Sequence, residues 1–459
     1  MKISKIKISK FHQFEDFELD LTYPKGHEKE GKPLDKVCFI GQSGTGKTTL
    51  LEMIKHACTP YLTPSIRFES DLFSTSDGED FGFFRFYREK DKYSEESYMD
   101  VSVAYNDDSK KLDDPFEAEE PIARALLYFA TGLSNADLTQ SMINSFEKKI
   151  LIEPNKTYRP RKAPIKELNF HQVTKDSIKS IWEAFYQLIQ NHQQDEANFK
   201  LNLINRFEKE KIDISKELSN WRSQHPNPIE IVAKECLNPI LKQFQLAVKT
   251  EVDDVRQLHS LQISSLFEKT TIPYEFLSTG TKQIIFTAFP IYQLLEDDSI
   301  VLMDEPETSL YPDIQREIIP YYTSFDKNKT SQFFFATHSP IIASAFEPWE
   351  IVELKFDEKG KVYRDKYYEG ENHVNNYRLD AQILRYDQIL TRIFDLSGDS
   401  DAKRAEKLQE LAILKNKVER LKKEEMDKPS AETQKIINEY LQLSDDISGT
   451  WALSRHEKN

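Results

Sequence analysis

The sequence has few cysteines, no long hydrophobic runs and no excess of basic residues, and each absence excludes a class of protein. Cys38, Cys58 and Cys236 are too few and too scattered for a disulfide framework or a metal knuckle, which agrees with a reducing cytoplasm. The longest apolar runs, such as residues 299–303, fall far short of the ~20 residues that a membrane-spanning helix needs. Residues 1–14 alternate between polar and apolar and lack the apolar block of a signal peptide. We therefore expect a cytoplasmic protein with no membrane partner.

The balance of charge is acidic, with 62 Lys and Arg against 77 Asp and Glu and a formal net charge of −15. This argues against a protein whose whole surface binds nucleic acid. One local basic cluster surrounds Tyr158 and consists of Lys156, Arg159, Arg161 and Lys162. Such a cluster suits a nucleic-acid backbone or an acidic partner, and it equally suits a solvated loop. DNA binding therefore stays open.

The first part of the chain reads as β-structure around one helix. Alternation in residues 3–8 and 14–21 predicts a β-hairpin. An apolar run at 36–40, followed by apolar residues at helical spacing in 47–58, predicts a strand, a loop and a helix. Alternating aromatic residues in 81–87 indicate further antiparallel strands. Their side chains are expected in the core, although aromatics of this kind also stack on bases.

The rest of the chain changes from helical to mixed patterns and back. Long charged helices are expected from about Asp176 to Phe267. Strands return at 299–303 and 332–336 with a helix at 314–323 between them, which is the βαβ rhythm of a parallel sheet. A hairpin is expected around 351–368. The helical tail from residue 382 onward suggests a helical hairpin or a short coiled coil, because apolar residues recur there at 3-4-3 spacing: Leu411, Leu414, Val418 and Leu421.

A glycine-rich segment between the strand and the helix of the first part carries a complete phosphate-binding motif, G-x-x-x-x-G-K-[ST]. In such a loop successive backbone N–H groups close around a β-phosphate, and the helix N-terminus adds the positive end of its dipole. Lys47 is predicted to reach the β- and γ-phosphates, and Thr48 to bind Mg²⁺. The predicted ATP contacts are Gly41, Gln42, Ser43, Gly44, Thr45, Gly46, Lys47, Thr48 and Thr49.

Two adjacent carboxylates follow the apolar strand at 299–303. Adjacent acids at a strand end can divide their work, so Asp304 is predicted to hold Mg²⁺ and Glu305 to act as the catalytic base on the attacking water. The alternative is an ordinary turn at the strand end in which the two carboxylates have no catalytic role. His338 follows the strand at 332–336 and is predicted to hydrogen-bond the γ-phosphate and to sense its loss. A structural or exposed histidine is the alternative there.

A further serine and glycine, Ser278 and Gly280, stand before the apolar helical pattern that precedes the acidic strand. A serine hydroxyl, a glycine backbone and a helix N-terminus can form a second anion site. Taken alone, Ser278 also fits an ordinary helix N-cap.

The order of these motifs resembles that of the ABC-type ATPases. Their LSGGQ signature matches at Leu277, Ser278 and Gly280, whereas Thr279 replaces the first glycine and Thr281 the glutamine. Such variants are typical of the branch that holds the SMC, RecF and OLD-like ATPases. The resemblance implies an ABC-type ATPase head, with a mixed sheet and an antiparallel β-subdomain. It also implies that Ser278 and Gly280 close over the ATP of a second subunit, so that the partner is another copy in a homodimer or higher homo-oligomer.

The spacing of the motifs argues against two groups of ABC-type ATPases, the transporter cassettes and the SMC proteins. Residues 49–276 separate the phosphate-binding loop from the signature, which is a far longer separation than in a transporter cassette. The insertion is nevertheless too short for SMC arms at ~1.5 Å per residue. The RecF/OLD-like group remains, which includes the ATPase subunits of the Septu and PARIS anti-phage systems. The resemblance covers residues 1–58 and 276–354. Residues 309–313 would be the D-loop, and no Q-loop glutamine can be placed between 66 and 128.

OLD-like proteins often carry a metal-dependent TOPRIM nuclease, and two acidic segments imitate parts of it, Glu369–Glu371 and Asp399–Asp401. The second leads directly into a Lys-rich helix, so a helix N-cap is the better interpretation. We expect no nuclease in this chain. The resemblance implies instead a regulatory ATPase that controls a separate nuclease or toxin effector, with a phage protein as a potential trigger.

Together these patterns predict an α/β P-loop NTPase that binds ATP and Mg²⁺. The expected parts are the first half of the ATPase head at 1–150, a helical insertion at 151–268, the second half of the head at 269–370 and a helical extension at 371–459. Two alternatives stay open. One is a DNA-repair ATPase of RecF or SMC-like type, and the other is a scaffold that binds ATP and hardly hydrolyses it.

Overall fold

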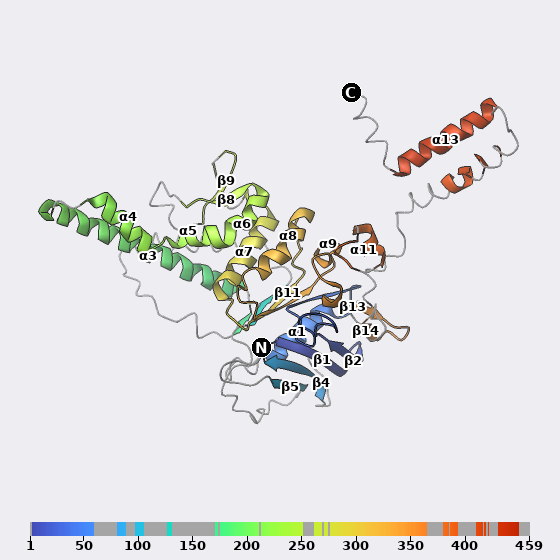
Figure 1. Ribbon diagram of the computed structural model, residues 1–459, viewed down its shortest axis with the longest axis horizontal. Helices are drawn as coiled ribbons and strands as arrows, with labels where there is room; N and C mark the ends of the chain where they lie inside the picture. Colours follow the sequence, from blue (N-terminus) through green and yellow to red (C-terminus); the bar gives the residue numbers. More distant parts are fainter. Residues whose placement is uncertain are drawn as a thin grey trace. The chain divides into compact units, whose positions relative to one another are not determined.

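The computed structural model divides into two compact units, Met1–Tyr386 and Asp387–Asn459. The first unit carries all the motifs of the nucleotide site and is drawn in Figure 1. The structure describes residues 2–58, 80–88, 97–104, 126–130, 170–172, 175–210, 213–250, 261–268, 270–273, 276–364, 380–384, 386–392, 410–415, 417–418, 421 and 430–448.

An eleven-stranded sheet forms the centre of the first unit among the residues described, in the order β5-β4-β1-β2-β14-β13-β3-β12-β11-β6-β7. Its parallel strands run from β13 in the middle through β3, β12, β11 and β6 to β7 at one edge. The strands are β1 (Lys2–Phe11), β2 (Phe14–Asp20), β3 (Lys36–Gly41), β4 (Asp80–Arg88), β5 (Ser97–Ala104), β6 (Leu126–Phe129), β7 (Phe170–Gln172), β11 (Ile300–Asp304), β12 (Gln332–Ala336), β13 (Ile351–Phe356) and β14 (Val362–Arg364).

The antiparallel side of the sheet confirms the expected hairpins. β1 pairs with β2 on one side and with β4 on the other, and β4 pairs with β5. Alternation places Ile6 and Ile8 on a fully buried face, and Ile3 is fully buried as well, beyond a shift of register between Ile3 and Lys5. Phe84 and Phe86 of β4 are also fully buried, so these aromatics belong to the core and not to a stacking surface. These strands are continuous with the parallel strands, because β14 joins β2 to β13.

The parallel strands β3, β12 and β11 bury nearly every side chain, as expected for strands that are covered on both faces. Helix α1 (Lys47–Cys58) contributes Leu50, Leu51 and Ile54 to the same core. The order β3-β12-β11 brings together the carboxyl ends of strands that are far apart in the sequence. In open α/β sheets this edge is where ligands bind.

The insertion is only partly helical, which corrects the expectation of helices throughout residues 176–267. Helices α3 (Lys175–Glu210) and α4 (Ile214–Gln224) run beside each other (Figure 1) and are followed by α5 (Pro228–Val232), a π-helical turn (Ala233–Leu237), α6 (Asn238–Leu241) and a 3₁₀ turn (Lys242–Phe244). A small antiparallel sheet then forms from β8 (Leu246–Val248), β9 (Ile263–Ser265) and β10 (Thr271–Ile272). Strands of two or three residues are too short to show a period in the sequence.

The remaining helices of the first unit include α7 (Thr279–Leu294), α8 (Pro312–Thr323) and α9 (Pro340–Ala343), with a 3₁₀ turn at Pro348–Glu350. Helix α11 (Tyr386–Arg392) lies at the boundary of the two units. The described part of the second unit is helical, as expected, and includes α13 (Ala431–Ser448) and residues 410–415. The four domain boundaries drawn from the sequence stay predictions. Among the residues described, no helix combines the length and apolar character needed to cross a membrane.

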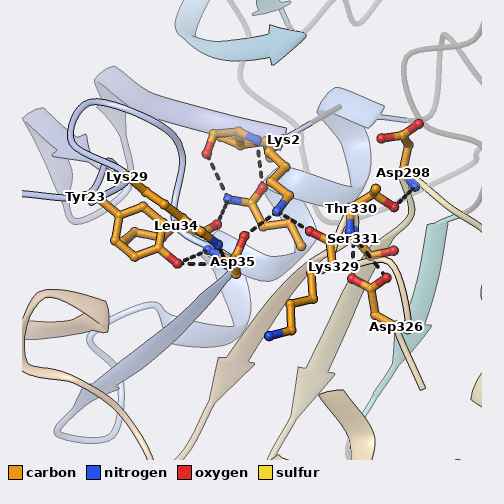
Figure 2. A network of polar contacts seen from close by, with 12 residues as sticks. Lys2, Tyr23, Lys29, Leu34, Asp35, Asp298, Asp326, Lys329, Thr330 and Ser331 are labelled. Carbon is orange, nitrogen blue, oxygen red and sulfur yellow. Dashed lines mark hydrogen bonds and ion pairs between the residues drawn. The ribbon is translucent and has the colours of Figure 1, made fainter. Parts of the chain in front are cut away.

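Polar side chains join the amino ends of three strands at the edge of the sheet opposite the motifs. Gln332 is fully buried, accepts a hydrogen bond from the N–H of Ile3 at 2.7 Å and donates to the carbonyls of Ile3 and Leu34 at 2.9 Å each. Beside it Asp35 forms ion pairs with Lys2 and Lys29 (Figure 2). Although burial acts to raise the pKa of Asp35, these two ammonium groups hold it below the usual value. The contacts fix β1 against β3 and β12.

Candidate nucleotide-binding site

The predicted phosphate-binding loop connects β3 to α1, with the strand–loop–helix order expected from the motif. Gly44 and Gly46 have φ of 86° and 89°, a region that side chains rarely adopt. A Cβ atom on Gly46 would lie 2.6 Å from Cζ of Phe14, at the tip of the β1–β2 hairpin. Gln13 from the same tip donates to the carbonyl of Gly44 at 3.2 Å. The hairpin therefore supports the loop from outside.

Lys47 is buried within the loop. Its ammonium group donates to the carbonyls of Gly41 at 2.9 Å and Gln42 at 3.2 Å. Burial lowers the pKa of Lys47 to about 8, against the opposing effect of the nearby carboxylates, of which Asp304 is the strongest. A phosphate oxygen beside the ammonium group would compensate for its lost hydration, so the buried lysine is suited to an anionic ligand.

Thr48 and Asp304 meet although they lie far apart in the sequence. The hydroxyl of Thr48 donates to Oδ2 of Asp304 at 2.9 Å. Asp304 ends β11, and Thr48 lies in the first turn of α1. These are hard oxygen donors at the edge of a phosphate-binding loop, and a donor set of this kind fits Mg²⁺. The structure thus brings together the two predicted magnesium ligands.

Glu305 and His338 follow neighbouring parallel strands and face each other. Oε1 of Glu305 lies 3.9 Å from Nε2 of His338, and both side chains are partly exposed. Glu305 adopts a left-handed φ of 48°, and its N–H donates to the carbonyl of Ala336 at 2.8 Å, which fixes the turn after β11 to the end of β12. Partial burial and the charge of Lys47 lower the pKa of His338, so its imidazole is mostly neutral at pH 7.

A third carboxylate, Glu307, was missed by the sequence analysis. Its Oε1 accepts hydrogen bonds from the hydroxyl of Thr337 at 2.6 Å and from the N–H of His338 at 3.0 Å. Burial raises the pKa of Glu307. The only signal in the sequence was a second acidic residue two positions after Glu305, and that spacing by itself does not indicate a partner on another strand.

The serine of the signature segment caps α7. Oγ of Ser278 accepts from the N–H of Thr281 at 3.1 Å, so the N-cap reading describes its present contacts. A Cβ atom on Gly280 would lie 2.4 Å from the carbonyl oxygen of Ser309, in the predicted D-loop. Two exposed aromatic side chains flank these segments, Phe276 at 80% and Tyr311 at 70% exposure. Ser278 and Gly280 thus lie against their own helix and the backbone of Ser309.

Other predicted features fall outside the part of the chain that the structure describes. They are the basic cluster at Lys156–Lys162 and the acidic segments Glu369–Glu371 and Asp399–Asp401. Most of the region searched for a Q-loop glutamine, residues 66–128, also lies outside it. Cys38, Cys58 and Cys236 are described, and all three are free and buried.

Known proteins and protein families resemble the part of the chain that carries the nucleotide site. The model of the AAA ATPase domain family matches residues 1–343. Similar solved structures include the SMC head bound to the C-winged helix domain of ScpA, at 11% identity and a TM-score of 0.39, covering 80% of this chain and 97% of that one. Another is an SMC head domain with an extended coiled coil bound to the C-terminal domain of ScpA, derived from Pyrococcus furiosus, at 12% identity and a TM-score of 0.37, covering 79% and 96%. Among curated proteins none matches the chain.

The family match includes the phosphate-binding loop, the signature segment, the two carboxylates Asp304 and Glu305 at the end of β11, and His338. Because it extends over about three quarters of the sequence, and because the fold is that of an α/β P-loop NTPase, the chain belongs to the AAA ATPase domain family.

Proposed function

We propose that this protein hydrolyses ATP with the help of Mg²⁺, and that hydrolysis takes place between two copies of the chain. The observation that carries the proposal is the convergence of five side chains at one sheet edge: Lys47, Thr48, Asp304, Glu305 and His338. Lys47 binds the β- and γ-phosphates once they replace its bonds to the loop carbonyls. The backbone N–H groups of residues 41–49 enclose the β-phosphate.

Thr48 and Asp304 are the residues that would hold the metal, since their oxygen atoms already lie 2.9 Å apart beside the loop. When bound, Mg²⁺ neutralises charge on the β- and γ-phosphates. Glu305 orients the attacking water and accepts its proton through a carboxylate that solvent can reach. The pKa of His338 is lowered, so its ring is mostly neutral at pH 7, and the ring nitrogen that keeps its proton can donate a hydrogen bond to a γ-phosphate oxygen and detect its departure.

The proposal of two copies rests on the signature segment. Ser278 and Gly280 lie at the start of α7, where the first N–H groups of a helix and its dipole favour an anion. Their contacts are with their own helix and with Ser309 and Leu310. In the proposed dimer this surface covers the nucleotide of the other subunit, and the exposed rings of Phe276 and Tyr311 contact the neighbour.

Complementation between two inactive variants tests the dimer. Lys47→Ala disables both phosphate loops of a dimer, and Ser278→Arg disables both signature surfaces, so each variant alone is expected to be inactive. In an equal mixture half of the dimers are mixed, and each has one intact composite site of two. The mixture is therefore expected to recover about one quarter of the wild-type ATPase rate, provided that subunits exchange freely.

The control for this mixture is a double variant, Lys47→Ala with Ser278→Arg, combined with wild-type protein. Its mixed dimers have no intact composite site. One site pairs the wild-type phosphate loop with the altered signature of the double variant, and the other site pairs the altered loop with the wild-type signature. This mixture should therefore show only the activity of wild-type dimers. The absence of any recovery in the first mixture, with subunit exchange demonstrated, would contradict the shared site.

We further propose that the ATPase regulates a separate effector, a nuclease or toxin, in bacterial defence against phage. The support is the resemblance of the motifs to RecF/OLD-like ATPases of such systems. The surface of α3 gives a place for a partner, since Leu201, Ile204 and Phe207 are about half exposed or more at successive intervals of three residues. A phage protein would act as the trigger, and a cytoplasmic location is part of this proposal.

Copurification tests the partner. Tagged Glu305→Gln protein, which is expected to retain ATP, would be isolated from the native host with and without nuclease treatment of the lysate, and Lys47→Ala would serve as the control without nucleotide. A stoichiometric protein partner that survives nuclease treatment and is lost with Lys47→Ala is the expected result. Recovery of DNA with repair proteins, lost on nuclease treatment, would favour the RecF-like alternative instead.

A further inference from the structure

Glu307 connects the turn after β11 to the residues that carry His338. Its Oε1 is shared by two donors, the hydroxyl of Thr337 at 2.6 Å and the N–H of His338 at 3.0 Å. Its Oε2 is hidden from solvent and has no hydrogen-bond partner within the described chain. An oxygen that is hidden from solvent cannot take up an attacking water, and the other oxygen of Glu307 is occupied by two donors, whereas the carboxylate of Glu305 is partly exposed. The two acidic residues therefore differ in what they can do.

The segment after β12 is held from its other side by Gln315 of α8. The hydroxyl of Ser339 donates to Oε1 of Gln315 at 2.6 Å, and Nε2 of Gln315 donates to the carbonyl of Leu310 at 2.9 Å. The N–H of Ser339 also donates to Oγ1 of Thr337 at 2.9 Å. The backbone on both sides of His338 is thus fixed by hydrogen bonds, although the imidazole ring itself is exposed.

We propose that Glu307 is a positioning residue, which fixes the peptide N–H of His338 and so aims its ring at the γ-phosphate beside Glu305. The inference rests on the role proposed above for His338. The bond to the backbone of His338 and the bond to Thr337 end on the same oxygen atom. Removing that oxygen leaves two donors without an acceptor, one of them from a fully buried threonine. The segment must then shift to satisfy them, and the ring moves with it.

The test compares Glu307→Ala with its near-isosteric counterpart Glu307→Gln. Glu307→Ala is expected to lower kcat on the order of tenfold to a hundredfold, because a displacement of about 1 Å at a catalytic group has effects of this size. The dissociation constant for ATP should change by less than about threefold, because the hydrogen bonds shown for Glu307 are with Thr337 and His338 after β12. Glu307→Gln should retain most of the turnover, since the amide oxygen can accept the same two hydrogen bonds.

A double-variant cycle shows whether Glu307 acts through His338. His338→Ala is expected to lower kcat, and adding Glu307→Ala to it should cause no further loss. Losses that multiply would overturn the proposal, and so would a Glu307→Gln variant as slow as Glu307→Ala, since that result would assign the effect to charge. If Glu307→Ala does not fold, Thr337→Val removes one of the two donors and takes its place in the cycle. A His338→Ala variant with normal kcat would instead refute the proposed role of the histidine.

Discussion

Glu305→Gln is expected to lower the rate of ATP hydrolysis by about 10²–10⁴-fold while ATP binding is retained. The amide has the shape of the carboxylate but cannot accept a proton from the attacking water. The backbone should keep its conformation, since the left-handed φ of 48° and the N–H bond to Ala336 do not depend on the side-chain charge. Phosphate release at saturating ATP measures turnover, and equilibrium binding of a fluorescent ATP analogue measures affinity.

The matched control for this substitution is Glu317→Gln in α8, an exposed glutamate near Arg316. It should hydrolyse ATP at the wild-type rate. Full turnover by Glu305→Gln would refute the assignment of the base and would leave the scaffold that hardly hydrolyses ATP, or another base, as the explanation. Equal loss in both glutamine variants would indicate a general effect of the lost charge.

Gly46→Ala is expected to weaken ATP binding on the order of a hundredfold, because the loop must move by about 1 Å or more to make room. Backbone strain and steric overlap combine at this position. The φ of 89° is strained for any residue with a Cβ atom, and that atom would lie 2.6 Å from Phe14 and 2.7 Å from Gln13. Phe14 is fully buried and packs edge-on against Phe17, so its ring cannot simply move away. Isothermal titration with ATP would measure the loss.

Gly44→Ala separates the backbone strain from the steric overlap. Its φ of 86° imposes a similar backbone strain, yet the nearest heavy atom to its Cβ would be Cζ of Phe356 at 3.9 Å, an ordinary contact. We expect it to lower the free energy of unfolding by about 1 kcal/mol and to weaken ATP binding far less than Gly46→Ala. Equal loss of binding in both variants would show that backbone strain alone decides the effect, and that the support from the hairpin tip is unimportant.

Local patterns in the sequence were sufficient for the elements that surround the phosphate loop. The hairpin of β1 and β2 and the helix α1 follow from periods of two and 3.6 residues, and the strands β3, β11 and β12 follow from short apolar runs. The loop motif is contiguous, so all of its residues were identifiable before their positions were known. The parallel pairing of β11 with β12 followed from the helix between them.

The sequence by itself thus determined that this chain binds a nucleotide, because a phosphate loop is encoded in consecutive residues. Only the tertiary structure decided which distant side chains complete the site. The 2.9 Å contact of Thr48 with Asp304 and the bond of Glu307 to the peptide of His338 depend on the order of strands in the sheet. The burial of Gln332 between three strands is decided in the same way. Such contacts join residues far apart in the chain, and local sequence patterns do not predict which strands become neighbours in the sheet.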